Sequence, residues 1–378
     1  MKIMTVLGTR PEAIKLAPVL LALQGTPGVH SVLCVSGQHR EMLDPILANF
    51  GLRADRDLAL MQAGQSLAHI TQAVLAGVSA ALQTERPDWL LVQGDTSTAM
   101  AAALAAFYER VPIGHVEAGL RTYDPMKPWP EEINRRLISP MAALHFAPTA
   151  AAAQNLLREG LPAADVIVTG NTVIDALHAM LAQPDTATVL DDWLLQRAPA
   201  LLGSPRRIVL VTLHRRESLG EPLAGLCAAL QTLAARGDVE IVFPVHLNPQ
   251  VQQVVKAMLV GYERVHLLPP LDYRHFVALL QRCHLVLTDS GGLQEEAAAL
   301  DKPVVVARDR TERPEALRAG TAVLGGTEGT ALLRACTKLL DDAAAYDRMA
   351  RADNPFGDGR AAERIVATLV SRGAPGAG

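Results

Sequence analysis

The sequence predicts an α/β protein with two doubly wound, Rossmann-like domains that face a cleft. The chain has 378 residues, more than one hydrophobic core usually organises. Short apolar runs alternate along it with longer amphipathic or alanine-rich runs, a pattern typical of parallel strands covered by helices on both faces. This alternation stops near residue 182 and restarts near residue 207, which indicates a second sheet with its own helices.

Residues 1–170 are predicted to form the first domain. Its strand candidates are short apolar runs, at 2–7, 30–35, 88–93, 111–116, 143–147 and 165–170. The longer runs between them predict helices near 11–24, 66–83, 96–109, 131–142 and 149–159.

The segment 171–206 is polar, contains prolines and has no sustained period. We interpret it as a connection between domains, with a short helix near 190–196. The final segment, 356–378, reads as a turn and one amphipathic helix. Because no strand precedes that helix, we expect it to cross back onto the first domain.

The second domain is predicted over residues 207–355. Its strand candidates lie at 207–213, 239–245, 264–268, 284–289, 302–307 and 321–325. Helices are predicted near 222–235, 249–259, 272–281, 292–300 and 328–341.

Composition narrows the classes of partner. The net charge of −4 gives no reason to expect nucleic acid or an anionic membrane, and 4% aromatic residues do not favour a base-stacking platform. The four cysteines are far apart and predict buried, reduced thiols. No apolar run is long enough for a signal peptide or a membrane span, so we expect a cytoplasmic enzyme.

Familiar cofactor and metal motifs are not part of the pattern. No G-x-G-x-x-G follows a predicted strand, and neither a G-x-x-x-x-G-K-[ST] loop nor H-E-x-x-H is present, so no cofactor and no metal is expected. Asp55 and Asp57 superficially resemble a metal-binding pair, but their charged surroundings predict a solvated turn.

Acidic side chains mark the ends of two strands in the first domain. The strand at 111–116 ends in Glu117, and a proline-rich loop leads to Glu131 and Glu132 at the start of a helix. A carboxylate at the end of a buried strand is costly unless it is paired or used, so Glu117 and Glu131 are candidates for acid/base chemistry. We interpret Glu132 as a charge that favours the helix N-terminus. Asp95, which follows another strand, fits either a helix N-cap or the same acidic site.

Cationic and glycine-rich segments complete the predicted sites. Arg10 and Lys15 follow the first strand, where ligands bind in open parallel sheets. His214 lies between a strand and a glycine, beside two arginines, which is typical of an anion site. The turn at 290–292 precedes a helix whose N-terminus could bind an anion, with Glu296 one turn inside it.

At these motifs the chain resembles the non-hydrolysing UDP-N-acetylglucosamine 2-epimerases. The resemblance covers nearly the full length and rests on segments that occur in the family's order: GTRPEAIKLAPV, GQHREML, QGDTSTA, GHVEAGLRTYDPMKPWPEEINRR, HFAPT, VTGNTVIDAL, VTLHRRESLGEP, FPVHLNP, PLDY, TDSGGLQEEA, KPVVVARDRTERPE and NPFGDG. It implies the two-domain GT-B-like glycosyltransferase fold, a homodimer, and interconversion of UDP-N-acetylglucosamine and UDP-N-acetylmannosamine without metal or nicotinamide. The implied mechanism eliminates UDP to a 2-acetamidoglucal and adds it back.

The resemblance also assigns roles to residues. The catalytic residues it implies are Asp95, Glu117, Glu131 and His214. The residues it implies for binding UDP or the sugar are Arg10, Lys15, Arg135, Phe276, Ser290, Gly291, Gly292, Glu296 and Arg313. Gln38 and His39 match a regulatory substrate site of many bacterial members, but Gly64 stands where an arginine is common, so we expect weaker allosteric activation. Leu213, where a smaller residue is usual, is a modest departure.

Other activities stay open on the sequence alone. A related UDP-sugar such as a diacetamido-uronate would favour an extra cation near the sugar, which Arg121, Lys127 or Arg135 could supply. A hydrolysing relative would release free N-acetylmannosamine. A glycosyltransferase would share the fold and need an acceptor, and a nucleotide-sugar sensor would not need the carboxylates.

Overall fold

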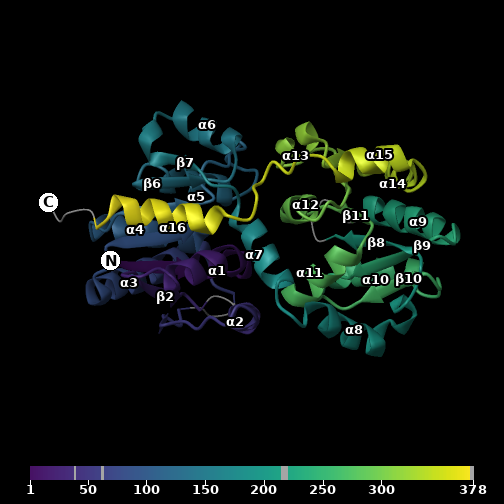
Figure 1. Ribbon diagram of the computed structural model, residues 1–378, viewed down its shortest axis with the longest axis horizontal. Helices are drawn as coiled ribbons and strands as arrows, with labels where there is room; N and C mark the ends of the chain where they lie inside the picture. Colours follow the sequence, from purple (N-terminus) through teal and green to yellow (C-terminus); the bar gives the residue numbers. More distant parts are fainter. Residues whose placement is uncertain (38–39, 61–63, 214–219, 375–378) are drawn as a thin grey trace. The chain divides into compact units, whose positions relative to one another are not determined.

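The computed structural model describes residues 1–37, 40–60, 64–213 and 220–374, and the chain divides into two compact units (Figure 1). Unit 1 comprises Met1–Ala179 together with Phe356–Gly378, and unit 2 comprises Met180–Pro355. Each unit is built on its own parallel sheet. The α/β fold with two Rossmann-like sheets is therefore confirmed.

Unit 1 contains a seven-stranded sheet in the order β3-β2-β1-β4-β5-β6-β7. Its strands are β1 (Lys2–Leu7), β2 (His30–Val35), β3 (Arg56–Asp57), β4 (Trp89–Gln93), β5 (Ile113–Val116), β6 (Leu144–Ala147) and β7 (Val166–Val168). Its helices are α1 (Arg10–Gln24), α2 (Arg40–Asn49), α3 (Leu67–Glu85), α4 (Ser97–Tyr108), α5 (Glu131–Ile138), α6 (Ala150–Arg158), α7 (Thr172–Leu181) and α16 (Ala361–Arg372), with a 3-10 turn at Ala163–Asp165.

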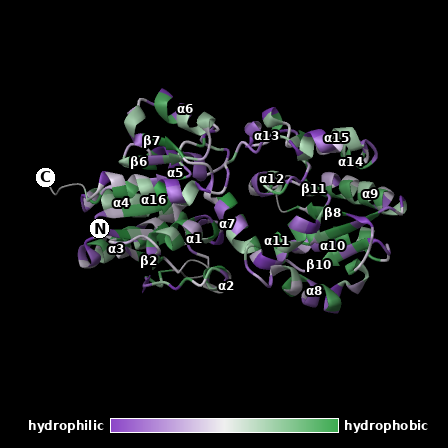
Figure 2. Cartoon of the chain, viewed as in Figure 1, coloured by the Kyte–Doolittle hydropathy of each residue, from purple (hydrophilic) through white to green (hydrophobic). Residues whose placement is uncertain are grey.

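The helices of unit 1 form two groups that cover the sheet. Helices α2, α1 and α16 pack side by side, and α3, α4 and α5 form the second group. Right-handed crossovers between parallel strands place such groups on opposite faces. Strands β1, β4 and β5 are accordingly almost wholly buried. Figure 2 colours the chain by hydropathy and shows hydrophobic and hydrophilic residues mixed along the helices that cover the sheet.

Unit 2 contains a six-stranded sheet in the order β10-β9-β8-β11-β12-β13. Its strands are β8 (Arg207–Thr212), β9 (Val239–Pro244), β10 (Val265–Leu268), β11 (Leu285–Thr288), β12 (Val304–Val306) and β13 (Ala322–Leu324). Its helices are α8 (Thr186–Arg197), α9 (Glu221–Ala235), α10 (Pro249–Leu259), α11 (Tyr273–Arg282), α12 (Gly291–Ala298), α13 (Pro314–Ala319), α14 (Gly329–Asp341) and α15 (Ala343–Ala350), with a 3-10 turn at Pro199–Leu201.

Strand order places a topological switch point in each sheet. In unit 1 the order reverses between β1 and β4, and in unit 2 it reverses between β8 and β11. Ligands of doubly wound sheets bind beyond the carboxyl ends of the strands at such points. The turns that follow these four strands are therefore the expected positions of ligand-binding residues.

Several segments differ from the sequence-based expectations. Segment 171–206, read as a connection, contains α7 and α8, and unit 2 begins at Met180 within α7. Asp55 and Asp57 flank and end the short edge strand β3, where they accept the backbone N–H groups of Leu33 at 2.7 Å and Ala59 at 2.9 Å. Both residues are exposed, as predicted for a solvated segment, and their carboxylates in addition hold the backbone.

Two further sequence-based predictions, on the cysteines and on membrane-spanning helices, can be compared with the structure. All four cysteines are free and buried. In the described part of the chain, no helix combines the length and apolarity that crossing a membrane would need.

Candidate active site

Glu12 joins the two turns at the switch point of unit 1. It lies in the first turn of α1 and completes a capping box with Thr9, whose backbone N–H it accepts at 2.7 Å. Its second oxygen accepts the hydroxyl of Thr96, the N-cap of α4, at 2.6 Å. Burial raises the pKa of Glu12, and the hydrogen bond from Thr96 opposes that rise. Sequence reasoning missed this residue, although the T-x-x-E spacing is a capping-box signature.

Glu117 is the most constrained side chain of the site. It follows β5 with φ 61°, a left-handed conformation that is costly for a residue other than glycine. The Nζ of Lys15 lies 2.6 Å from both carboxylate oxygens. The side-chain amide of Gln93 donates to Oε2, and that of Asn171 donates to Oε1 at 3.1 Å. Lys15, predicted to contact UDP, is thus paired with Glu117 in this structure.

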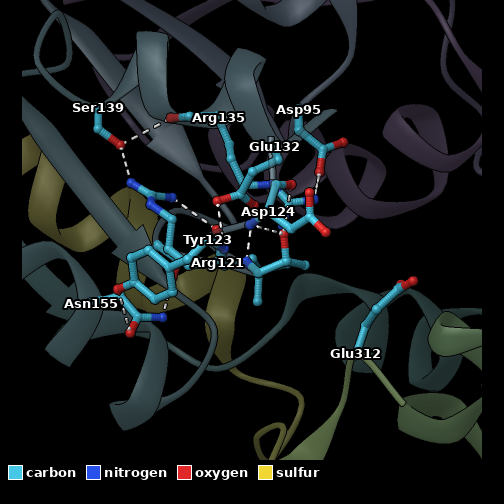
Figure 3. A network of polar contacts seen from close by, with 12 residues as sticks. Asp95, Arg121, Tyr123, Asp124, Glu132, Arg135, Ser139, Asn155 and Glu312 are labelled. Carbon is cyan, nitrogen blue, oxygen red and sulfur yellow. Dashed lines mark hydrogen bonds and ion pairs between the residues drawn. The ribbon is translucent and has the colours of Figure 1, made fainter. Parts of the chain in front are cut away.

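Asp95 lies beside this group and is held by α5 (Figure 3). The guanidinium of Arg135 donates to its carboxylate, and the amide of Asn134 donates to its backbone oxygen at 2.9 Å. Loss of hydration raises the pKa of Asp95, Arg135 opposes the rise, and the negative charge of Glu117 adds to it. The helix-cap interpretation of Asp95 is wrong, because Thr96 is the N-cap of α4.

The loop between Glu117 and α5 is tied down by buried charges (Figure 3). Glu132 is fully buried and accepts the backbone N–H groups of Thr122 and Tyr123 at 3.0 Å. Arg121 has a fully buried guanidinium, paired with Glu159 at 2.7 Å. Glu132 is therefore a loop anchor, beyond the predicted preference for a helix N-terminus.

Glu131 and Arg10 differ from these residues because their side chains have no partner among the described residues. Each is half-buried at a helix start, and neither side chain has a hydrogen bond or an ion pair to any residue that the structure describes. Glu131 lies four residues before Arg135 on α5, so both side chains share one helix face. The side chain of Glu131 is therefore available for contact with a bound molecule.

The switch point of unit 2 presents the N-terminus of α12. Ser290 is the N-cap of this helix and makes no side-chain cap bond, while its own N–H donates to the hydroxyl of Thr288 at 2.9 Å. Gly291 and Gly292 open the helix, and a Cβ added at Gly292 would meet no atom within 4 Å. The first N–H groups of a helix have no intrahelical partner, so this turn can bind an anion.

Two carboxylates of α12 are buried and held by other elements. Glu296 is 9% exposed and accepts the hydroxyl of Tyr273 at 3.0 Å, so it is not the exposed charge that is the usual alternative at such a position. Glu295 pairs with the guanidinium of Arg313. Sequence reasoning missed Tyr273, although it stands in the PLDY motif. Phe276 is half-buried on α11.

Three of the predicted site residues lie outside the described residues: His214, Gln38 and His39. Their predicted roles are untouched by the structure. Gly64, in the departing MQAGQS loop, has φ 76°, a conformation that favours glycine over arginine.

Comparisons with known proteins agree on one family. The family described as UDP-N-acetylglucosamine 2-epimerase matches residues 21–370. The chain is 52% identical over 369 residues to a "Probable UDP-N-acetylglucosamine 2-epimerase" of Ralstonia nicotianae, covering 97% of this chain and 98% of that one. It is 49% identical over 370 residues to the UDP-N-acetylglucosamine 2-epimerase of Yersinia pestis, covering 98% of each. The crystal structure of the UDP-GlcNAc 2-epimerase of Neisseria meningitidis bound to UDP-GlcNAc matches with a TM-score of 0.90 and 45% identity, covering 98% of this chain and 100% of that chain.

Proposed function

This chain belongs to the UDP-N-acetylglucosamine 2-epimerase family, and we propose that it interconverts UDP-N-acetylglucosamine and UDP-N-acetylmannosamine. The observation that carries the proposal is the group of Asp95 and Glu117 at the switch point of unit 1, each held by a cation. Epimerisation at C2 needs groups that remove and deliver a proton, and a carboxyl with a raised pKa, Asp95, close to a second carboxylate suits that task.

The proposed reaction proceeds by elimination and re-addition. A base of unit 1 removes the C2 proton while the C1–O bond breaks and UDP departs, which leaves a 2-acetamidoglucal. UDP then adds back to C1 as a proton is delivered to the opposite face of C2. The residues proposed for proton transfer and leaving-group contact are Asp95, Glu117, Glu131 and His214.

Unit 2 is proposed to hold the UDP group. The open helix N-terminus at Ser290 suits the diphosphate, and the buried carboxylate of Glu296 suits the hydroxyls of a ribose. The residues proposed to bind UDP or the sugar are Arg10, Lys15, Arg135, Phe276, Ser290, Gly291, Gly292, Glu296 and Arg313.

A uronate substrate is less well supported by the geometry. It would need an additional cation near the sugar, and Arg121 is buried on Glu159 while Arg135 is paired with Asp95. Lys127, which is exposed, is the remaining candidate of the three named in the sequence. Because these two arginines are already paired, the geometry favours a neutral sugar over a uronate.

Deuterium incorporation tests the proposed function. Purified protein is incubated with UDP-N-acetylglucosamine in deuterated water, and the expected product is UDP-N-acetylmannosamine with deuterium at C2. Free sugar would instead reveal hydrolysis. Reaction of the diacetamido-uronate without reaction of the neutral sugar would contradict the proposal.

A Glu117→Gln variant tests the acid/base role. We expect it to bind UDP and to lose turnover by about 100- to 10,000-fold, the usual contribution of general acid–base catalysis. Unchanged turnover would remove Glu117 from the mechanism.

A homodimer in the cytoplasm completes the proposal. Helices α4 and α5 pack together and expose Phe107, Tyr108, Ile133 and Leu137, which are 56%, 64%, 38% and 48% exposed. Apolar side chains gathered in this way suit a contact between copies. The free cysteines suit a reducing compartment. Light scattering should give twice the mass of the chain, and a Leu137→Asp variant should give half of that value.

A further inference from the structure

The VTGNTVIDAL segment places a fully oriented amide against Glu117. Asn171 is 3% exposed, and its Nδ2 donates to Glu117 Oε1 at 3.1 Å. Its Oδ1 accepts the N–H of Val173 at 3.2 Å, and its own N–H donates to the oxygen of Phe356 at 2.7 Å. Because the amide oxygen faces an N–H donor, the nitrogen must face the carboxylate.

A second side-chain amide, that of Gln93, donates to the other carboxylate oxygen of Glu117. Gln93 is the last residue of β4 and is 3% exposed, and its Nε2 donates to Oε2. The two amides come from the end of a central strand and the start of α7, so each is carried by a different element of unit 1. Neutral amide groups donate whether or not the carboxylate is charged, and their buried side chains have little freedom to leave.

Lys15 is a different kind of partner. Its ammonium bridges both oxygens at 2.6 Å on a flexible stem whose side chain is 16% exposed. A carboxylate has about four lone-pair positions, and Lys15 makes two contacts while each amide makes one. Of these three described donors, the lysine is the one whose flexible stem lets it move aside when a proton reaches Glu117.

We propose that Gln93 and Asn171 are positioning residues that hold the Glu117 carboxylate in place while its proton is exchanged. They act through Glu117 and need no contact with the substrate. The idea rests on the proposed acid/base role of Glu117. It assigns a task to Asn171, and through Phe356 it connects the start of the returning C-terminal segment to the reacting group.

The charged surroundings of Glu117 set the expected effect of a substitution. Among the described residues, Lys15 on α1 contacts Glu117, and Asp95 after β4 and His115 on β5 interact with its charge. Burial lowers the pKa of His115 to about 3, so this histidine adds no charge near neutral pH. An Asn171→Asp change would replace a donor by a second carboxylate, which raises the pKa of its neighbour.

The test compares three variants by their pH profiles of kcat and kcat/KM. Asn171→Asp keeps the size of the side chain and its bond to Val173, and Gln93→Met removes the other donor without adding charge. Asp175→Asn is the matched control, because Asp175 accepts the N–H of Ala362 at 2.8 Å from the same helix α7 without contacting Glu117. The limb of the profile that belongs to Glu117 is the one that Glu117→Gln abolishes.

We expect Asn171→Asp to lower kcat by about ten- to a hundredfold, the factor for a lost hydrogen bond to a charged group. The Glu117 limb should move up by about one pH unit or more, because a like charge disfavours ionisation. Gln93→Met should move it in the same direction by less, and it decides the question if Asn171→Asp does not fold. The control should keep the wild-type limb.

Two outcomes would overturn the proposal. One is a wild-type pH profile in the folded Asn171→Asp and Gln93→Met proteins. The other is an equal shift in Asp175→Asn, which would trace the effect to the fold of α7. Failure of the proposed function is distinguishable, because the wild-type protein would then incorporate no deuterium at C2.

Discussion

The Asp95 carboxylate illustrates how a residue that is kept for function can lower the stability of the fold. The pKa of Asp95 is raised above its usual 3.8 by lost hydration, so the folded protein disfavours the charged form. The associated contribution to stability is complete below the usual pKa and is lost as pH rises through the raised value. Above that window the ionised Asp95 therefore lowers the stability of the fold.

An Asp95→Asn variant should consequently be more stable than the wild type above that pH window and should lose turnover. Thermal unfolding followed across pH measures the effect, and the gain should shrink towards acid pH. Asp185→Asn, at an exposed position, is the control. A lower unfolding temperature of Asp95→Asn at pH 8 would mean that the pairing with Arg135 outweighs the lost hydration.

At the residue scale, the sequence predicted the carboxylates that follow strands and the cations that pair with them, Lys15 and Arg135, and it missed the neutral groups that hold the carboxylates. Asp95 and Glu117 follow apolar strands and stand out for that reason. Asn171 touches Glu117 from 54 positions away, a pairing that no local pattern encodes. Tyr273 is likewise 23 positions from Glu296, and only the fold brings the two together.

Among the elements, the crossing of the Glu117 loop and α6 depends on one glycine. Gly119 has φ 89°, and a Cβ there would lie 2.3 Å from the oxygen of Ala152. Both the backbone conformation and the contact exclude a larger residue. The amide of Asn155 donates to the oxygen of Gly119 at 2.9 Å, which fixes the same crossing.

We therefore expect Gly119→Ala to lower the free energy of unfolding by roughly 2–5 kcal/mol, through overpacking and left-handed strain. Chemical denaturation measures it. Gly25→Ala is the control, because Gly25 has φ −78° and an added Cβ there would make only an ordinary contact at 3.5 Å. Equal stability of the two variants would contradict the steric argument.

Two neighbouring strands carry buried histidines in register. His115 on β5 pairs with His145 on β6, and burial lowers their pKa values to about 3 and about 4. The folded state thus keeps both neutral while the unfolded chain binds protons near pH 6.5. Their stabilising contribution is present above that value and is lost as pH falls towards the folded-state pKa values.

Unit 1 should accordingly lose up to about 1.4 kcal/mol of stability per pH unit for each histidine in this window. His145→Gln should flatten the dependence, as seen in denaturation midpoints measured between neutral and acid pH. His30→Gln, at an exposed position of β2, should leave the slope unchanged. A wild-type slope in His145→Gln would sink the prediction.

The elements that the sequence did not predict have weak local signals. Helix α2 contains Pro45, and β3 is only two residues long. Helix α8 extends the short helix expected near 190–196, and it is held by long-range contacts, since Arg282 donates to Asp191 and to the oxygen of Ala187. The other strands were predictable because their mostly apolar runs need no such support.

For the whole molecule, the two units differ in how many segments of the chain build them. Unit 2 is one uninterrupted segment, whereas unit 1 is completed by α16, which packs on α1 (Figure 1). The indole of Trp89 donates to the oxygen of Gly373 at 2.8 Å, and Asp175 caps the start of α16. Buried residues of α16 seal that face: Ala361, Ala362, Ile365, Val366 and Leu369.

A fragment of residues 180–355 should therefore fold by itself, and a fragment of residues 1–179 should be markedly less stable than unit 1 in the full chain. Circular dichroism during heating distinguishes them. Adding a peptide of residues 356–374 should raise the unfolding temperature of the 1–179 fragment. A 1–179 fragment as stable as the full chain would show that α16 is dispensable.

The late position of α16 has a consequence for synthesis on the ribosome. Residues 361–372 are translated after all of unit 2, so the nascent amino-terminal half waits with the α1 face uncovered while an entire other module is made. Translation of an mRNA truncated before this helix would give a polypeptide whose apolar α1 face stays uncovered, and we expect such a chain to be more sensitive to proteases. Unit 1 can thus be completed only after translation has passed through the whole of unit 2.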